Sequence, residues 1–216
     1  MDFDIARRKM VDCQVRPNDV TDENVIEAFD SVPRESFVPK AKKLLAYSEL
    51  EIETAPGRAL WLSRDLSKLL QALNLRKTDL ALVIGAGEGY SAALLDGIVE
   101  TVIAIDSDET VTDAASERLT TLGYNRVAYV TGSLEQGYAS EGPYDVILVN
   151  GRVETLPAIW LDQLKPGGRL GAVVGDAHRA QARVYTASEH AVAHRNLFEC
   201  VPPALSEFDA EPTFEF

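Results

Sequence analysis

From residue 80 to residue 174 the chain alternates short apolar runs with helical segments, and this alternation constrains the fold more than any other feature. The apolar runs cover residues 80–84, 101–105, 126–130, 144–149 and 169–174. Between them the pattern predicts helices over 90–97, 108–122 and 156–164. Strands that are apolar throughout and separated by helices indicate a parallel, doubly wound α/β sheet.

The N-terminal third predicts a helical cap on that sheet. A helix is expected over residues 2–15, ending before a proline, and a second starts at an N-cap Thr21 and runs to about Phe29. A third helix, capped by Ser63, carries four leucines on one face, Leu66, Leu69, Leu70 and Leu73.

The C-terminal end predicts a different addition. Residues 182–187 and 194–201 are expected to form an antiparallel strand pair, and residues 202–216 an extended end that follows the surface. The whole chain, residues 1–216, is therefore expected to form one domain, with the cap in 1–75 and the core with its last strands in 76–216.

Charge and composition exclude several classes of function. The net charge of −13 disfavours nucleic acid and anionic membranes as partners. No apolar run approaches the roughly 18 residues that span a bilayer, and the first residues lack the apolar core of a secretory signal. Cys13 and Cys200 fit no metal-ligand spacing, so we expect two reduced cysteines, no metal and a cytoplasmic location.

A glycine turn follows the first apolar run and predicts a ligand site. Gly85, Gly87 and Gly89 form a G-x-G-x-G pattern between a strand and a helix, where glycine lets a ligand approach the backbone. The dinucleotide fingerprint would need glycine where Tyr90 stands, and the chain contains no P-loop pattern. Asp106 ends the next strand, where a carboxylate can accept hydrogen bonds from a ribose. This combination is typical of methyltransferases that use S-adenosylmethionine; a tight turn without a ligand is the alternative.

The order and spacing of several segments resemble the protein-L-isoaspartate O-methyltransferase family. The resemblance covers about residues 20–175 and is carried by VIEAFDSVPRESFVP, LLAY, VIGAGEGYSAALL, LGYNRVAYVTG, GPYDVILV and QLKPGGRLGAVVGD. It implies a Rossmann-like sheet of seven strands with an antiparallel C-terminal strand, S-adenosylmethionine as the cofactor, and methylation of the misplaced carboxyl group of isoaspartyl residues in damaged proteins.

The resemblance also implies the residues of the cofactor site. These are Gly85, Ala86, Gly87, Glu88, Gly89, Asp106, Ser107, Gly132, Ser133 and Asn150. Two positions depart from the family pattern, because the family carries an acid where this chain has Val83 and a second acid where it has Ser133. Glu88 is expected to reach the ammonium group of the cofactor.

The largest departure lies in the stretch that approaches the substrate in the family. The family's Gln-Thr-Ile-Ser is replaced by Arg58, Ala59, Leu60 and Trp61, so an indole stands at the serine position. We expect Trp61 to fill or reshape the substrate pocket, Arg58 to attract a carboxylate or to face solvent, and Ser63 to supply the missing hydroxyl if the loop is shifted. These three residues are the candidates for catalysis.

The altered loop leaves three functions open. The first is a carboxyl methyltransferase with weakened isoaspartyl activity, because an ionised carboxylate needs positioning and no general base. The second is a binding protein that keeps the fold and has lost catalysis. The third is a methyltransferase for another carboxylate or a small molecule. The oligomeric state is unreadable from the sequence, with a monomer slightly favoured.

Overall fold

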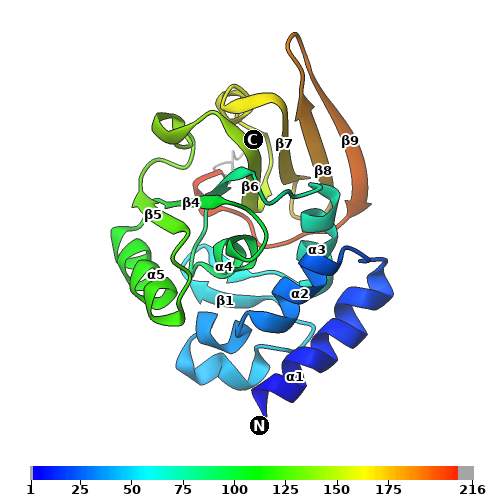
Figure 1. The fold of residues 1–216 in the computed structure, drawn as a ribbon, viewed down its shortest axis with the longest axis vertical. Helices are drawn as coiled ribbons and strands as arrows, with labels where there is room; N and C mark the ends of the chain where they lie inside the picture. Colours follow the sequence, from blue (N-terminus) through cyan, green and yellow to red (C-terminus); the bar gives the residue numbers. More distant parts are fainter. Residues whose placement is uncertain (1, 209–216) are drawn as a thin grey trace, which may run out of the picture.

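A computed structural model describes residues 2–208 and contains a seven-stranded sheet with the strand order β5-β4-β3-β6-β7-β8-β9 (Figure 1). The strands are β3 (Leu80–Ile84), β4 (Thr101–Asp106), β5 (Val127–Thr131), β6 (Tyr144–Val153), β7 (Leu164–Gly175), β8 (Ala180–Ala187) and β9 (Val192–Glu199). β3 to β7 pair in parallel, and β8 and β9 pair antiparallel. The predicted sheet and its antiparallel end are confirmed.

The helices between the strands largely follow the prediction. They are α4 (Tyr90–Asp96), α5 (Glu109–Leu122) and α6 (Ala158–Leu161). Gly123 ends α5 in a left-handed conformation, φ +87°, as a C-terminal glycine should. The prediction of a helix over 156–164 was wrong in extent, since α6 has only 4 residues and β7 already begins at Leu164.

The N-terminal segments form the expected helical cap. It contains α1 (Phe3–Met10), a π-helical turn Val11–Val15, a 3₁₀ turn Arg16–Asn18, α2 (Glu23–Ser31), two 3₁₀ turns Arg34–Phe37 and Lys40–Leu45, and α3 (Ser63–Ala72). The α-helical and π-helical segments together span Phe3–Val15, close to the predicted 2–15, and the chain continues through Pro17 as the 3₁₀ turn.

Two of the predicted helix caps were wrong. The N-cap of α2 is Asp22, whose side chain accepts hydrogen bonds from the amides of Asn24 and Val25, instead of Thr21. The N-cap of α3 is Leu62, and Ser63 is the first helical residue. Its hydroxyl points to the sulfur of Met10, 3.0 Å away, and therefore does not cap the helix.

A small hairpin occupies part of the altered loop that precedes α3. β1 (Ile52–Ala55) and β2 (Arg58–Leu60) pair antiparallel and turn at Gly57, which has φ +68°. The sequence pattern missed it because both strands are short and mix charged with apolar residues. The hairpin fixes the backbone of Arg58, and with it the direction of that side chain.

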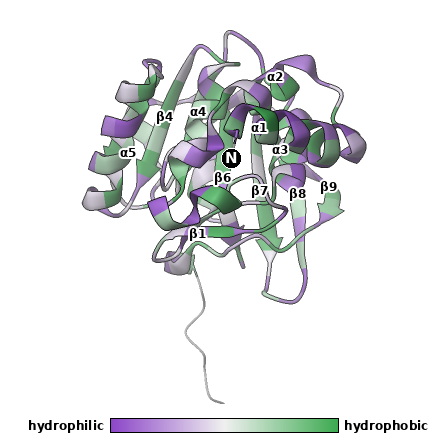
Figure 2. Ribbon diagram, turned by 90° about the horizontal axis from the view of Figure 1, so that it is seen from below, coloured by the Kyte–Doolittle hydropathy of each residue, from purple (hydrophilic) through white to green (hydrophobic). Residues whose placement is uncertain are grey.

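Two apolar clusters lie on the two faces of the sheet, because side chains alternate along each strand. Ala81 and Val83 of β3 belong to the cluster that includes residues of α3, α4 and α5, and Leu82 and Ile84 belong to the other. Figure 2 shows the strands predominantly green and the helices mixed green and purple. Within residues 2–208, no helix is long and apolar enough to cross a membrane.

The chain beyond β9 does not simply follow the surface. It crosses back toward the middle of the sheet, near β4 and β6, where it forms a 3₁₀ turn, η6 (Ser206–Phe208) (Figure 1). We call residues 203–208 the tail segment. Leu205 within it is 1% exposed, so the expectation of a surface end was wrong there. Residues 209–216 of that stretch lie outside the described residues.

Candidate functional site

The glycine turn has the geometry that its sequence predicts. Gly85, Gly87 and Gly89 have φ values of +70°, +55° and +87°, conformations that favour glycine. The amides of Gly85 and Ala86 donate to the carbonyl of Ile105 in β4 at 3.0 and 3.1 Å. The turn is therefore held against the carboxyl end of β4, where Asp106 stands.

Asp106 is fully buried and its carboxylate is saturated with donors. The amides of Gly87 and Ser107 donate to its two oxygens at 2.8 Å each. The guanidinium of Arg58 donates to the same two oxygens, from Nε at 2.8 Å and from Nη2 at 2.9 Å. Bidentate pairing of this kind is among the strongest charge-assisted contacts in proteins.

Arg58 reaches this carboxylate from β2 and also binds Glu207 of the tail segment. Its side chain is 5% exposed, and Nη2 lies 2.5 Å from Oε1 of Glu207. Burial alone would lower the pKa of Arg58, but the hydrogen bonds to Asp106 and Glu207 outweigh it and raise that pKa. The guanidinium is therefore a permanent cation between two carboxylates. The alternative of a solvent-facing arginine was wrong.

The tail segment covers the glycine turn with an apolar side chain. A Cβ built on Gly85 would lie 2.5 Å from Cδ2 of Leu205, and one built on Gly151 would lie 2.6 Å from Cγ of Leu205. Leu205 thus fills the space that these two glycines leave open. Beside it, the rings of Phe208 and Trp160 meet edge to face with centroids 5.3 Å apart.

The other predicted cofactor residues gather around the same turn, most of them in contact with protein groups. Asn150 donates to the carbonyl of Gly85 at 2.9 Å. Glu88 pairs with Arg118 of α5 at 2.6 Å. The amide of Gly132 donates to the carbonyl of Asp106 at 2.9 Å, and Ser133 beside it is exposed. Glu88 is accordingly held toward α5 in this conformation.

The three candidates for catalysis do not converge on one surface. Trp61 is 1% exposed and belongs to the apolar cluster beneath the cap, and Ser63 is 2% exposed with its hydroxyl on Met10. Arg58 alone points toward the glycine turn. Neither Trp61 nor Ser63 presents a side chain to solvent in this conformation.

Sequence reasoning missed three groups that shape the site. Glu207 and Leu205 come from a stretch without periodicity, and nothing in their local sequence indicates that they return to the glycine turn. The hydroxyl of Tyr129, in β5, donates to the carbonyl of Gly87 at 2.5 Å, and burial raises the pKa of this tyrosine well above its usual value. For Tyr129, the only indication in the sequence was that it lies in a predicted strand.

The site in this conformation does not accommodate S-adenosylmethionine. A ribose at Asp106 would need carboxylate oxygens that Arg58 already occupies, and Leu205 fills the space beside Gly85. The conflict comes from two side chains, Arg58 and Leu205, while the three glycines of the turn keep their left-handed φ values. Among residues 2–208, no group of three or more metal-binding side chains is found either.

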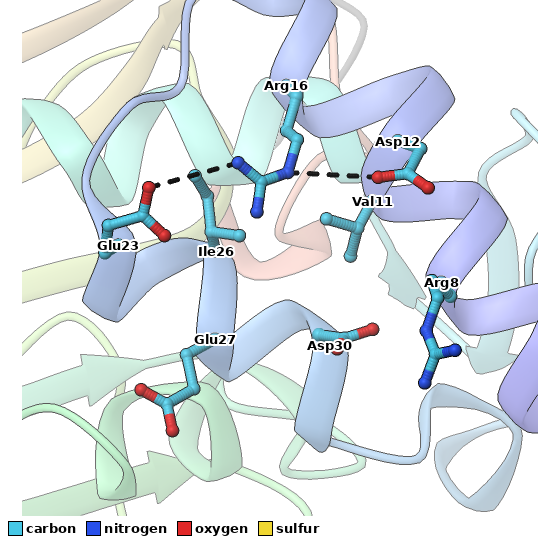
Figure 3. Close-up of a pocket in the computed structure, with 8 residues that line it drawn as sticks. All are labelled: Arg8, Val11, Asp12, Arg16, Glu23, Ile26, Glu27 and Asp30. Carbon is cyan, nitrogen blue, oxygen red and sulfur yellow. Dashed lines mark ion pairs between the residues drawn. The ribbon is translucent and has the colours of Figure 1, made fainter.

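A separate hollow of about 400 Å³ lies between α1 and α2 and shares no residue with the glycine turn (Figure 3). Arg16 lies 3.9 Å from both Asp12 and Glu23 across it. These side chains are between 49% and 80% exposed, so their charges are solvated. The hollow resembles an ordinary polar surface more than a binding site.

Comparison with known proteins agrees with this architecture. The family model for protein-L-isoaspartate(D-aspartate) O-methyltransferase matches residues 6–202. A protein-L-isoaspartate O-methyltransferase of Roseiflexus castenholzii is 37% identical over 175 residues, 81% of this chain and 80% of the relative. One from Methanoculleus marisnigri is 35% identical over 169 residues, 78% of this chain and 77% of the relative.

Solved structures show the same fold. A protein-L-isoaspartate O-methyltransferase superposes with a TM-score of 0.81 at 24% identity, covering 92% of this chain and 65% of that one. A putative enzyme of that name from Plasmodium falciparum, in complex with S-adenosyl-L-homocysteine, gives a TM-score of 0.77 at 16% identity and covers 92% of this chain and 97% of its own. With the family model and these relatives spanning most of its length, the chain belongs to the protein-L-isoaspartate(D-aspartate) O-methyltransferase family.

Proposed function

We propose that this chain is an S-adenosylmethionine-dependent carboxyl O-methyltransferase that acts on isoaspartyl residues of damaged proteins. Family membership supports the reaction type and the kind of substrate. The observation that carries the proposal in this chain is the glycine turn, whose left-handed residues stand directly beside the strand-end carboxylate of Asp106. A reducing, cytoplasmic compartment is part of the proposal, in keeping with the free thiols of Cys13 and Cys200.

The chemistry of the substrate explains why the altered hairpin is compatible with activity. An isoaspartyl carboxylate is ionised near neutral pH, so methyl transfer to it requires no general base. The protein has to hold the carboxylate in line and away from water. Replacing a serine by Trp61 therefore removes a positioning contact and leaves the nucleophile itself unchanged.

One observation favours a second function, a binding protein that keeps the fold without catalysis. The Arg58–Asp106 pair occupies the carboxylate that would otherwise hold the cofactor. If this pair never opens, neither cofactor binding nor methyl transfer takes place, and the surface around the hairpin is all that remains for function.

Two measurements separate these functions. Calorimetry with S-adenosylmethionine reports cofactor binding, and formation of a methyl ester on an isoaspartyl peptide, followed as the methanol released when the ester is hydrolysed, reports transfer, with the same peptide carrying normal aspartate as the control. The first function predicts ester formation on the isoaspartyl peptide alone. If neither the wild type nor variants that lack the contacts of the tail segment bind the cofactor at millimolar concentration, the second function, a binding protein, is the one that remains.

Asp106→Ala tests the assignment of the cofactor site. The substitution removes hydrogen bonds to a charged acceptor, which contribute about 1.5–3 kcal/mol. Cofactor binding should weaken by about 10- to 100-fold. Unchanged affinity in a folded variant would place the cofactor elsewhere.

A further inference from the structure

We propose that the tail segment, together with Arg58, is an internal ligand of the cofactor site, and that S-adenosylmethionine binds only after this segment leaves. The inference rests on the proposed function and adds a means of regulating the same site. It follows from what occupies the glycine turn in the structure: a cation on the strand-end carboxylate and an apolar side chain on the turn.

The polar half of this contact is a chain of three charged groups. Asp106 binds Arg58, and Arg58 binds both oxygens of Glu207, at 2.5 and 3.1 Å. The hydroxyl of Ser107 donates to Glu207 and lies 3.2 Å from Nη2 of Arg58. Burial alone would raise the pKa of Glu207, but the hydrogen bonds from Arg58 and Ser107 outweigh it and lower that pKa to about 2. The ion pair therefore persists throughout the neutral range.

The apolar half of the contact depends on two glycines. Gly85 and Gly151 both face Leu205, and a methyl group at either position would meet it at 2.6 Å or less. Gly85 belongs to the glycine turn, so the surface that would face a nucleoside is the surface that Leu205 covers. Phe208 adds an edge-to-face contact with Trp160, itself fixed by a hydrogen bond from its indole to the carbonyl of Leu134 at 2.8 Å.

The backbone sets the register of the tail segment. The amide of Arg152 donates to the carbonyl of Pro203 at 2.9 Å, and the amide of Leu205 donates to the carbonyl of Arg152 at 3.0 Å. These two bonds form a short bridge between Ala204 and the end of β6. They place Leu205 over the glycines and Glu207 beside Arg58.

The position of the segment in the chain allows it to leave while the sheet remains intact. It follows β9, the edge strand of the sheet, which ends at Glu199 and keeps its own pairing with β8. Release breaks the contacts of Glu207 with Arg58 and Ser107, one apolar contact region and two backbone bonds. Arg58 then lacks its second carboxylate, and its pair with Asp106 has to open as well before a ribose can reach Asp106. The apparent affinity for the cofactor is then the intrinsic affinity multiplied by the fraction of molecules in the open state.

Calorimetry with S-adenosylmethionine on matched variants tests the proposal. Leu205→Ala combined with Glu207→Gln removes the tail side chains from both halves of the contact, and a chain that ends at Val201 removes the segment altogether. The controls are Glu189→Gln, an exposed acid in the β8–β9 turn, and a chain that ends at Phe208. We expect at least about tenfold tighter binding in the double variant and the shorter chain, and wild-type affinity in both controls. Equal measurable affinity in all of these proteins would overturn the proposal while leaving the proposed function standing.

A second readout reports the segment directly. In Leu205→Cys, the introduced thiol should react slowly with an alkylating reagent, as followed by mass spectrometry of the peptide that contains position 205. Millimolar S-adenosylmethionine, or the additional change Glu207→Gln, should accelerate the reaction at least about tenfold. Fast labelling without either would show that the segment does not cover the turn. If no variant binds the cofactor, both the proposed function and the proposed role of the tail segment are refuted, whatever the labelling rate.

Discussion

Arg34 lies fully inside the protein and donates hydrogen bonds to two backbone carbonyls. Nε donates to the carbonyl of Ala46 at 2.7 Å and Nη2 to that of Trp61 at 2.6 Å, while the guanidinium lies 4.9 Å from the ring centre of Tyr90. One side chain thereby joins the cap, the end of the hairpin and α4.

Arg34→Lys should destabilise the protein by about 2–4 kcal/mol. An ammonium cannot reproduce the planar fork that reaches two separate carbonyls, and a buried charge without its hydrogen bonds is costly. Urea unfolding measures the loss, with Arg8→Lys on the exposed face of α1 as the matched control. A loss no larger than that of the control would mean that the cap does not depend on Arg34.

Trp61→Ser is expected to cost stability before it affects catalysis. The indole is 1% exposed in the apolar cluster, and removing a large buried aromatic side chain costs about 3–5 kcal/mol. Thermal unfolding should show this loss, whereas Leu62→Ser at the half-buried neighbour should lose far less. A stable Trp61→Ser protein with higher methyl transfer would instead support a serine-sized pocket at this position.

At the scale of elements, the long periodic segments were predictable and the short irregular ones were not. The strands from β3 to β9 and the helices α4 and α5 followed from period and length, because buried parallel strands are apolar on both faces. The β1–β2 hairpin and the tail segment depend on contacts between residues far apart in sequence, such as Arg58 with Asp106. Local pattern carries no information about such pairs, so the glycine turn could be predicted while its occupant could not.

Gly151→Ala tests how β6 and the tail segment fit together. The added methyl would lie 2.6 Å from Leu205, and Gly151 has no left-handed φ that would add strain of its own. We expect a loss of about 1–3 kcal/mol in the wild type, as for other overpacked sites, and a much smaller loss in Leu205→Ala. A double-mutant cycle by urea unfolding measures this coupling, and additive losses would mean that Leu205 does not lie on Gly151.

At the scale of the whole molecule, the two faces of the sheet are covered unequally. One apolar cluster contains residues of the N-terminal cap, including α3, and of α4 and α5. The other cluster contains residues of the short α6 and Leu205, and Phe208 packs against it. The tail segment therefore completes a core as well as covering the glycine turn. Its stability and its effect on ligand binding are consequently linked, and conditions that weaken one should weaken the other.

Acid provides such a condition through Glu207, whose pKa is lowered from 4.5 to about 2. Between these values the unfolded chain binds a proton that the folded chain does not, so this contribution to the free energy of unfolding is complete above about pH 4.5. It decreases as the pH falls and is lost near pH 2. The side chain is 32% exposed, so solvent screening limits the contribution to on the order of 1 kcal/mol.

Urea unfolding of the wild type and Glu207→Gln from pH 7 to pH 3 isolates this contribution, since all other carboxylates titrate alike in the two proteins. The wild type should be more stable by a constant amount above pH 5, and the difference should shrink steadily toward pH 3. Glu189→Gln should show no such trend. A difference that stayed constant down to pH 3 would mean that Glu207 titrates normally and is not held by Arg58, and the ion-pair half of the tail contact would then have to be abandoned.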